Sequence, residues 1–96
     1  MRRKTYSIFD KAALAFLQPF FLQTDGEAKR SFIDAVKNHD NFREYPNDFV
    51  LYRLGQFDDG NGQFIQDEGC PEQLMTAVDA LKFINGVNLA DQFIYK

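Results

Sequence analysis

Residues 24–37 read TDGEAKRSFIDAVK, and this stretch decides the fold. Thr24 and Glu27 are spaced as a capping box, in which a threonine hydroxyl and a glutamate satisfy the first free amide groups of a helix. One apolar stripe then recurs at the helical period, formed by Ala28, Phe32, Ala35 and Val36. We therefore predict an amphipathic helix that begins after Thr24 and ends near Asn38 or His39.

Extended segments flank this helix on both sides. Residues 4–9 alternate as a strand does, and residues 14–23 form a second extended segment in which Pro19 indicates a sheet edge or a bulge. Residues 49–57 carry apolar side chains on both faces, which is typical of a central strand. The turn at residues 58–62 then returns the chain into a short strand over residues 63–66.

A second helix is expected after the last strand. Pro71 and Glu72 suit its first turn, and Asn85-Gly86 suits its end. The predicted order is ββαββα plus a C-terminal tail, which defines one α+β domain over residues 1–96: an antiparallel β-sheet with two helices on one face. The expected core consists of Phe32, Val36, Leu51, Leu54, Leu74, Val78 and Leu81. Residues 87–96 are too apolar for a free tail, so we expect an edge strand or a docking tail there.

Composition limits the class of protein. Ninety-six residues leave room for one core, and the single Cys70 excludes an internal disulfide. The basic start Met1–Lys4 is not followed by an apolar run, so it is no signal peptide, and residues 14–22 are too few to span a bilayer. We expect a cytosolic protein without membrane contact.

The charge is unevenly distributed along the chain. The net charge is −3, yet residues 1–43 hold eight basic and five acidic side chains, whereas residues 44–96 hold three basic and nine acidic ones. Folding could turn the two halves into a basic and an acidic face, or both could be merely solvated surface.

The sequence indicates no enzyme, no metal site and no cofactor. His39 is the only histidine and suits a helix C-terminus better than catalysis. The turn at residues 58–62 lacks the flanking helices and the final glutamate of a calcium loop. Asp67 and Glu68 have no base, nucleophile or ligand nearby in the sequence.

One basic and aromatic set predicts nucleic-acid binding. Aromatic side chains on a sheet stack on single-stranded bases, and neighbouring cations hold the phosphates. The candidate residues are Arg2, Arg3, Lys4, Tyr6, Tyr52 and Arg53. The alternative is that the aromatics belong to the core and the basic terminus is only solvated.

Phe83 is a candidate for a protein contact. By helical spacing it lies opposite the apolar stripe of the second helix, next to Lys82. An exposed phenylalanine there suggests a partner contact, for example the seam of a homodimer.

The chain resembles the small nonstructural protein of gokushoviruses, the Microviridae branch that includes the Chlamydia phages. The resemblance covers most of residues 4–59 and rests on Tyr6–Lys11, Pro19–Phe21, Thr24–Ala28 with Arg30 and Phe32, and Leu51-Tyr52 through Leu54-Gly55 to Phe57-Asp58. These stretches carry no catalytic motif.

The resemblance implies a non-enzymatic accessory protein that acts in the cytoplasm of the infected bacterium, in viral single-stranded DNA synthesis and packaging. The alternative function is a protein-interaction module that contacts host or procapsid proteins and never DNA.

Overall fold

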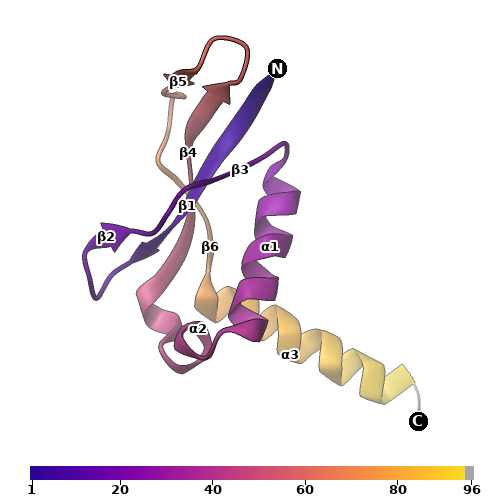
Figure 1. Cartoon of the computed structure of the whole chain (residues 1–96). Coiled ribbons are helices and arrows are strands. Elements are labelled where there is room, and N and C mark those ends of the chain that lie inside the picture. Colours follow the sequence, from indigo (N-terminus) through magenta and orange to yellow (C-terminus); the bar gives the residue numbers. More distant parts are fainter. Residues whose placement is uncertain (95–96) are drawn as a thin grey trace.

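The computed structural model describes the backbone of residues 1–94 and the side chains of residues 1–86. In chain order its elements are β1 (Arg2–Asp10), β2 (Ala15–Phe16), β3 (Phe20–Leu22), α1 (Asp25–Asn38), α2 (Asp40–Glu44), the 3-10 turn η1 (Pro46–Asp48), β4 (Phe49–Asp58), β5 (Gln63–Ile65), β6 (Glu72–Thr76) and α3 (Ala77–Ile94). The predicted α+β class with an antiparallel sheet is confirmed (Figure 1).

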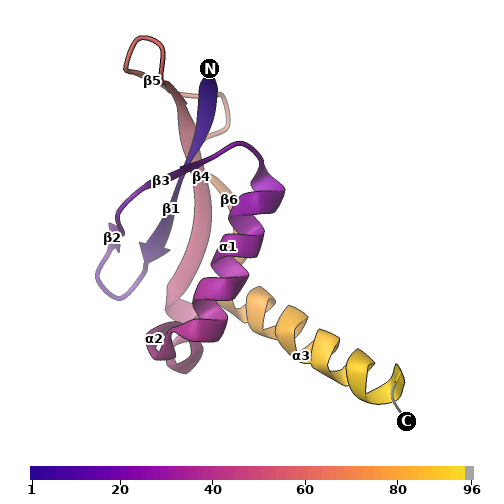
Figure 2. The same cartoon turned by 45° about the vertical axis from the view of Figure 1, so that its right-hand side comes forward.

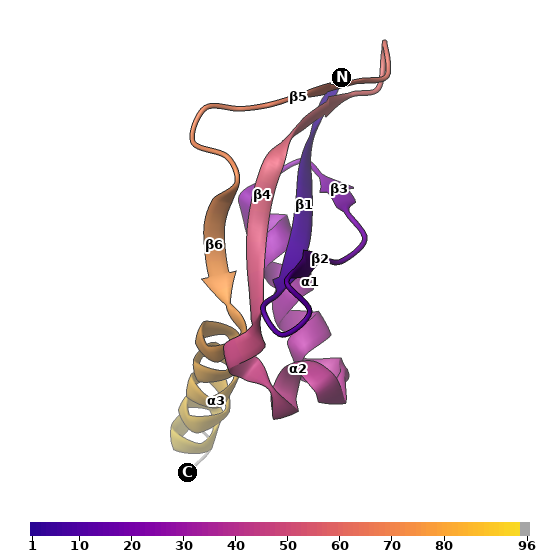
Figure 3. The same ribbon diagram turned by 90° about the vertical axis from the view of Figure 1, so that its left-hand side faces the viewer.

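Two long strands form the centre of the sheet. β1 and β4 pair antiparallel along their whole lengths, from Arg2 opposite Asp58 to Asp10 opposite Phe49. The outer edge of β1 is covered by β2 and β3, and the outer edge of β4 by β5 and β6 (Figure 3). The prediction that residues 49–57 form a central strand is therefore confirmed.

α1 begins as the sequence predicts. Thr24 is its N-cap, and the Thr24 hydroxyl accepts a hydrogen bond of 3.1 Å from the Glu27 amide. The last backbone bond runs from the His39 amide to the Ala35 carbonyl.

Replacing Thr24 by Ala is expected to lower the free energy of unfolding by about 1 kcal/mol, because the first turn loses its side-chain acceptor. Urea denaturation would measure the loss. Thr24→Ser keeps the hydroxyl and serves as the control; a Thr24→Ala protein as stable as Thr24→Ser would contradict the capping role.

The core lies between one face of the sheet and the helices α1 and α3. Its buried apolar members are Tyr6, Ala28, Phe32, Val36, Phe49, Leu51, Ala77 and Ala80. Of the predicted core, Phe32, Val36 and Leu51 are buried, whereas Leu54, Leu74, Val78 and Leu81 are only half-buried. α1 and the start of α3 cover this face, and no helix of residues 1–94 lies on the opposite face of the sheet (Figure 2).

The predicted start of the second helix was wrong. Residues 72–76 form β6, which pairs with the free edge of β4, and α3 begins only at Ala77. Thr76 and Asp79 cap it reciprocally: the Asp79 amide donates to the Thr76 hydroxyl at 3.0 Å, and the Thr76 amide donates to the Asp79 carboxylate at 3.3 Å. This second capping box marks the true helix start.

The predicted end of that helix was also wrong. The α3 backbone continues through Asn85-Gly86 to Ile94, and it leads away from the sheet (Figures 1 and 2). One glycine inside a helix costs only about 1 kcal/mol, so an Asn-Gly pair does not force an end. Residues 87–94 are therefore helical rather than an edge strand. The alternative prediction, a docking tail over residues 87–96, depends on side chains that lie outside the described residues. None of the described helices is long and apolar enough to cross a membrane.

Candidate functional site

Tyr6 does not lie where base stacking would need it. Its side chain is fully buried against α1, and its ring stacks on Phe20 with centroids 5.7 Å apart. The Tyr6 hydroxyl donates a hydrogen bond of 2.8 Å to the Asp25 carboxylate. Burial, and then this bond, raise the pKa of the phenol above its ordinary value. The prediction that Tyr6 stacks on bases was wrong, because its ring offers no face to solvent.

Arg53 is likewise occupied within the fold. Its guanidinium forms ion pairs with Asp25 at the start of α1 and with Glu72 on β6, and only 19% of its side chain is exposed. The pKa of Arg53 is raised, first by the neighbouring Cys70 side chain and then, against the effect of burial, by the two carboxylates. Arg53 thus joins α1, β4 and β6, and its pairing with two carboxylates leaves little of the guanidinium for the predicted phosphate contact.

Tyr52 points to the opposite, helix-free face. It is half-buried there and packs edge-on against Phe9 and Phe16, with ring centroids 6.4 Å and 5.6 Å away. Phe16 itself is 43% exposed. Tyr52 thus belongs to an aromatic cluster of three strands, which covers one end of the helix-free face.

The basic N-terminal strand keeps part of its charge. Arg2 is exposed and Lys4 half-buried. Arg3 is 45% exposed, and its guanidinium lies 3.4 Å from the Asp59 carboxylate. The amino group of Met1 lies 2.8 Å from the same carboxylate, and this pairing lowers the pKa of Asp59 and raises that of the amine. Asp59 therefore offsets some of the positive charge at this end of the sheet.

An exposed cluster of phenylalanines lies beside Arg3. Phe21, Phe57 and Phe64 come from β3, β4 and β5, and their ring centroids are 4.9 to 6.3 Å apart. We call these three residues the aromatic patch. Phe64 is 69% exposed and Phe21 is 37% exposed. Arg3 pairs with Phe57 in the β1–β4 register, so it lies on the same face.

The aromatic patch is absent from the predicted site, although one local signal points to it. A turn over residues 58–62 places Phe57 and Phe64 at mirrored positions, and the structure pairs them directly. Phe21 joins them through β1, because Thr5 pairs with Phe21 on one side and with Gly55 on the other. That contact depends on strand order, which no local pattern fixes.

Phe83 is exposed, as its helical position predicts. It is 55% exposed and borders a cavity between α1 and α3. Across the residues with described placement, the structure shows no cluster of three or more His, Cys, Asp or Glu side chains that could hold a metal ion.

The comparison with protein families identifies a bacteriophage protein. A family described as "Phage ORF5 protein" matches residues 3–80, from β1 to the first turn of α3. The chain belongs to this family. Neither the comparison with curated proteins nor that with solved structures gives a match.

Proposed function

We propose that this phage protein is a non-enzymatic accessory factor in viral single-stranded DNA synthesis and packaging, and that it binds single-stranded DNA weakly in the cytoplasm of the infected bacterium. The observation that carries the proposal is the aromatic patch: phenylalanines from three strands, two of them exposed, lie beside Arg3 on the sheet face that α1 and α3 leave uncovered. Membership of a phage family and the resemblance to gokushovirus nonstructural proteins agree with this role.

The patch has the two components that single-strand binding needs. Every base can stack on an aromatic ring, so Phe21 and Phe64 would bind bases with little sequence preference. Arg3 would hold a phosphate beside the patch, and Arg2 and Lys4, which alternate to the other side of β1, would add positive charge at this end of the sheet. The Tyr52 cluster lies on the same face near the far end of β1, with its centre about 15 Å from that of the patch at the usual rise per strand residue. It would offer a second stacking platform to the same strand.

The test is a salt series of binding to single-stranded and duplex DNA. We expect single strands to bind better, with about micromolar affinity at low salt, because Asp59 and the net negative charge oppose phosphate. The logarithm of affinity should fall against the logarithm of salt with a slope of about −0.7 per phosphate contact. Replacing Arg2 and Arg3 by Ala should flatten the slope by about one unit.

Phe64→Ala should weaken single-strand binding by about 1–3 kcal/mol without changing the slope, because it removes stacking and no charge. Phe83→Ala is the matched control, since it removes an exposed phenylalanine on the helical side and should leave DNA affinity unchanged. Equal effects of the two variants would overturn the patch as the binding surface. No binding of DNA even at low salt would overturn the DNA role itself.

A second candidate function is a protein-interaction module that contacts host or procapsid proteins without DNA. The observation in its favour is the exposed Phe83 beside the cavity between α1 and α3.

A further inference from the structure

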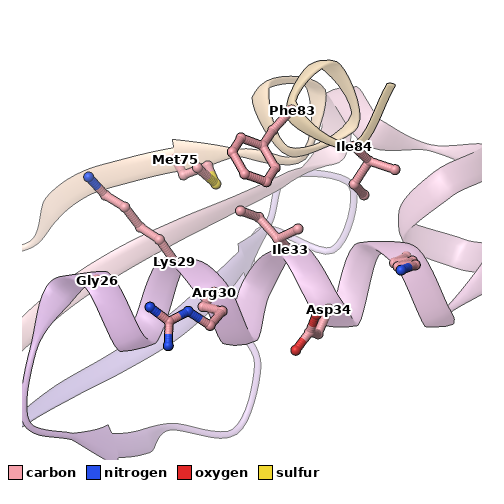
Figure 4. A pocket seen from close by; sticks show the side chains of 9 residues that line it. Gly26, Lys29, Arg30, Ile33, Asp34, Met75, Phe83 and Ile84 are labelled. Carbon is pink, nitrogen blue, oxygen red and sulfur yellow. The ribbon is translucent and has the colours of Figure 1, made fainter. Parts of the chain in front are cut away.

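An apolar groove separates α1 from the start of α3. Its cavity has a volume of about 520 Å³, which lies in the range of protein binding pockets. The apolar side chains come from three elements: Ile33 on α1, Met75 on β6, and Phe83 and Ile84 on α3 (Figure 4). Ile33, Met75 and Ile84 also pack against the buried core, so these three side chains of the groove have fixed positions.

Phe83 is the exposed part of this groove. Figure 4 shows its ring directed toward Ile33 and Met75 across the groove, rather than away from it. With 55% of the residue exposed, the ring leaves apolar surface in water that a ligand could cover.

The rim of the groove is basic. Lys29, Arg30 and Lys37 on α1 line the cavity, together with the single acid Asp34. This local excess of positive charge contrasts with the net charge of −3 of the whole chain. The groove is therefore complementary to a ligand that combines an apolar surface with negative charges beside it.

We propose that this groove docks an acidic amphipathic helix of a partner protein. Two helices with an apolar channel between them provide the usual seat for a third, whose apolar residues at i, i+3, i+4 and i+7 fill the channel. Carboxylates beside that stripe would then meet Lys29, Arg30 and Lys37. A second copy seated groove to groove is disfavoured, because each basic rim would face the other.

The proposal is independent of DNA binding. The groove lies on the helical side of the sheet, whereas the aromatic patch lies on the helix-free face. Variants at one surface can therefore be measured for effects at the other, and each proposal can fail alone.

The test uses the full chain and two synthetic helical peptides of about 15 residues, near the length at which isolated helices begin to form. Both carry Leu and Phe at the i, i+3, i+4 and i+7 positions; one has Glu on the flanks and the other Lys. Fluorescence anisotropy of the labelled peptides measures affinity, and NMR shifts of the protein amides locate the contact. We expect the acidic peptide to bind at least about tenfold more tightly, with shifts around Ile33 and Phe83.

Three variants sharpen the result. Phe83→Ser should weaken the acidic peptide about tenfold, because it removes the exposed ring. The double variant Lys29→Glu and Lys37→Glu should reverse the preference in favour of the basic peptide. Phe64→Ser is the matched control; it removes an even more exposed ring from the other face and should leave peptide affinity unchanged.

Several results would overturn the proposal. One is equal binding of the two peptides, and another is an amide shift pattern centred on the sheet face. A third is sedimentation of the free protein as a dimer that Phe83→Ser dissociates, which would assign the groove to self-association.

Discussion

Gly55→Ala is expected to destabilise the protein by about 3 kcal/mol, the largest loss from a single added methyl group in this fold. Gly55 lies in β4 with φ of +154°, a conformation that side chains with a Cβ rarely adopt. A Cβ there would lie 2.4 Å from the Ile65 carbonyl oxygen. That oxygen belongs to the backbone of β5, so it can move away only if the strand pairing gives way.

Urea denaturation of three glycine variants separates the causes of this loss. Gly62 also has positive φ, but a Cβ there would meet nothing within 4 Å, so Gly62→Ala measures backbone strain alone. Gly86 lies within α3 with open space around it, so Gly86→Ala should be neutral or slightly stabilising. A Gly55→Ala protein as stable as Gly62→Ala would contradict the close approach of β5. Displacement of β5 would also move Phe64, so single-strand affinity should fall with stability.

Arg53→Met is expected to lower the free energy of unfolding by about 2 kcal/mol, because the half-buried carboxylate of Asp25 and the exposed carboxylate of Glu72 lose their common, largely buried cation. The loss would be larger if both carboxylates were fully buried. Because Asp25 is 31% and Glu72 is 49% exposed, water can solvate the unpaired carboxylates in the variant and reduce the loss.

The matched control for Arg53→Met is Arg43→Met. Arg43 also pairs with an acid, Asp40, but both partners are well exposed, at 48% and 77%. An exposed pair of this kind contributes at most about 1 kcal/mol, so Arg43→Met should change stability little. A double-mutant cycle of Arg53→Met with Asp25→Asn measures their coupling directly. Equal losses for Arg53→Met and Arg43→Met would show that Arg53 does not join the elements.

Local signals in the sequence were sufficient for α1 and for the central strand. The Thr24 cap and the stripe of Phe32 and Val36 lie within the helix itself, so no distant contact is needed to predict them. Local signals were not sufficient for β6, because Pro71 and Glu72 resemble a helix start when pairing with β4 is not considered. The open edge of β4 requires hydrogen-bond partners, and residues 72–76 supply them.

The candidate site was harder to predict than the fold. Strand alternation separates Tyr6 from Ser7, but it does not say which face the helices will cover. Tyr6 and Arg53 turned out to face α1, where Asp25 binds both, although Asp25 lies 19 and 28 residues away from them. The aromatic patch depends on the same kind of distant pairing.

Both outer edges of the sheet are interrupted. Residues 17–19, including Pro19, separate β2 from β3, and residues 66–71, including Pro71, separate β5 from β6. A long straight edge is a template on which further copies of a chain add as strands, and proline and short edge strands prevent such growth. The longest of these four edge strands has five residues. These short, proline-interrupted edges disfavour edge-to-edge pairing between copies of a domain that exposes several phenylalanines.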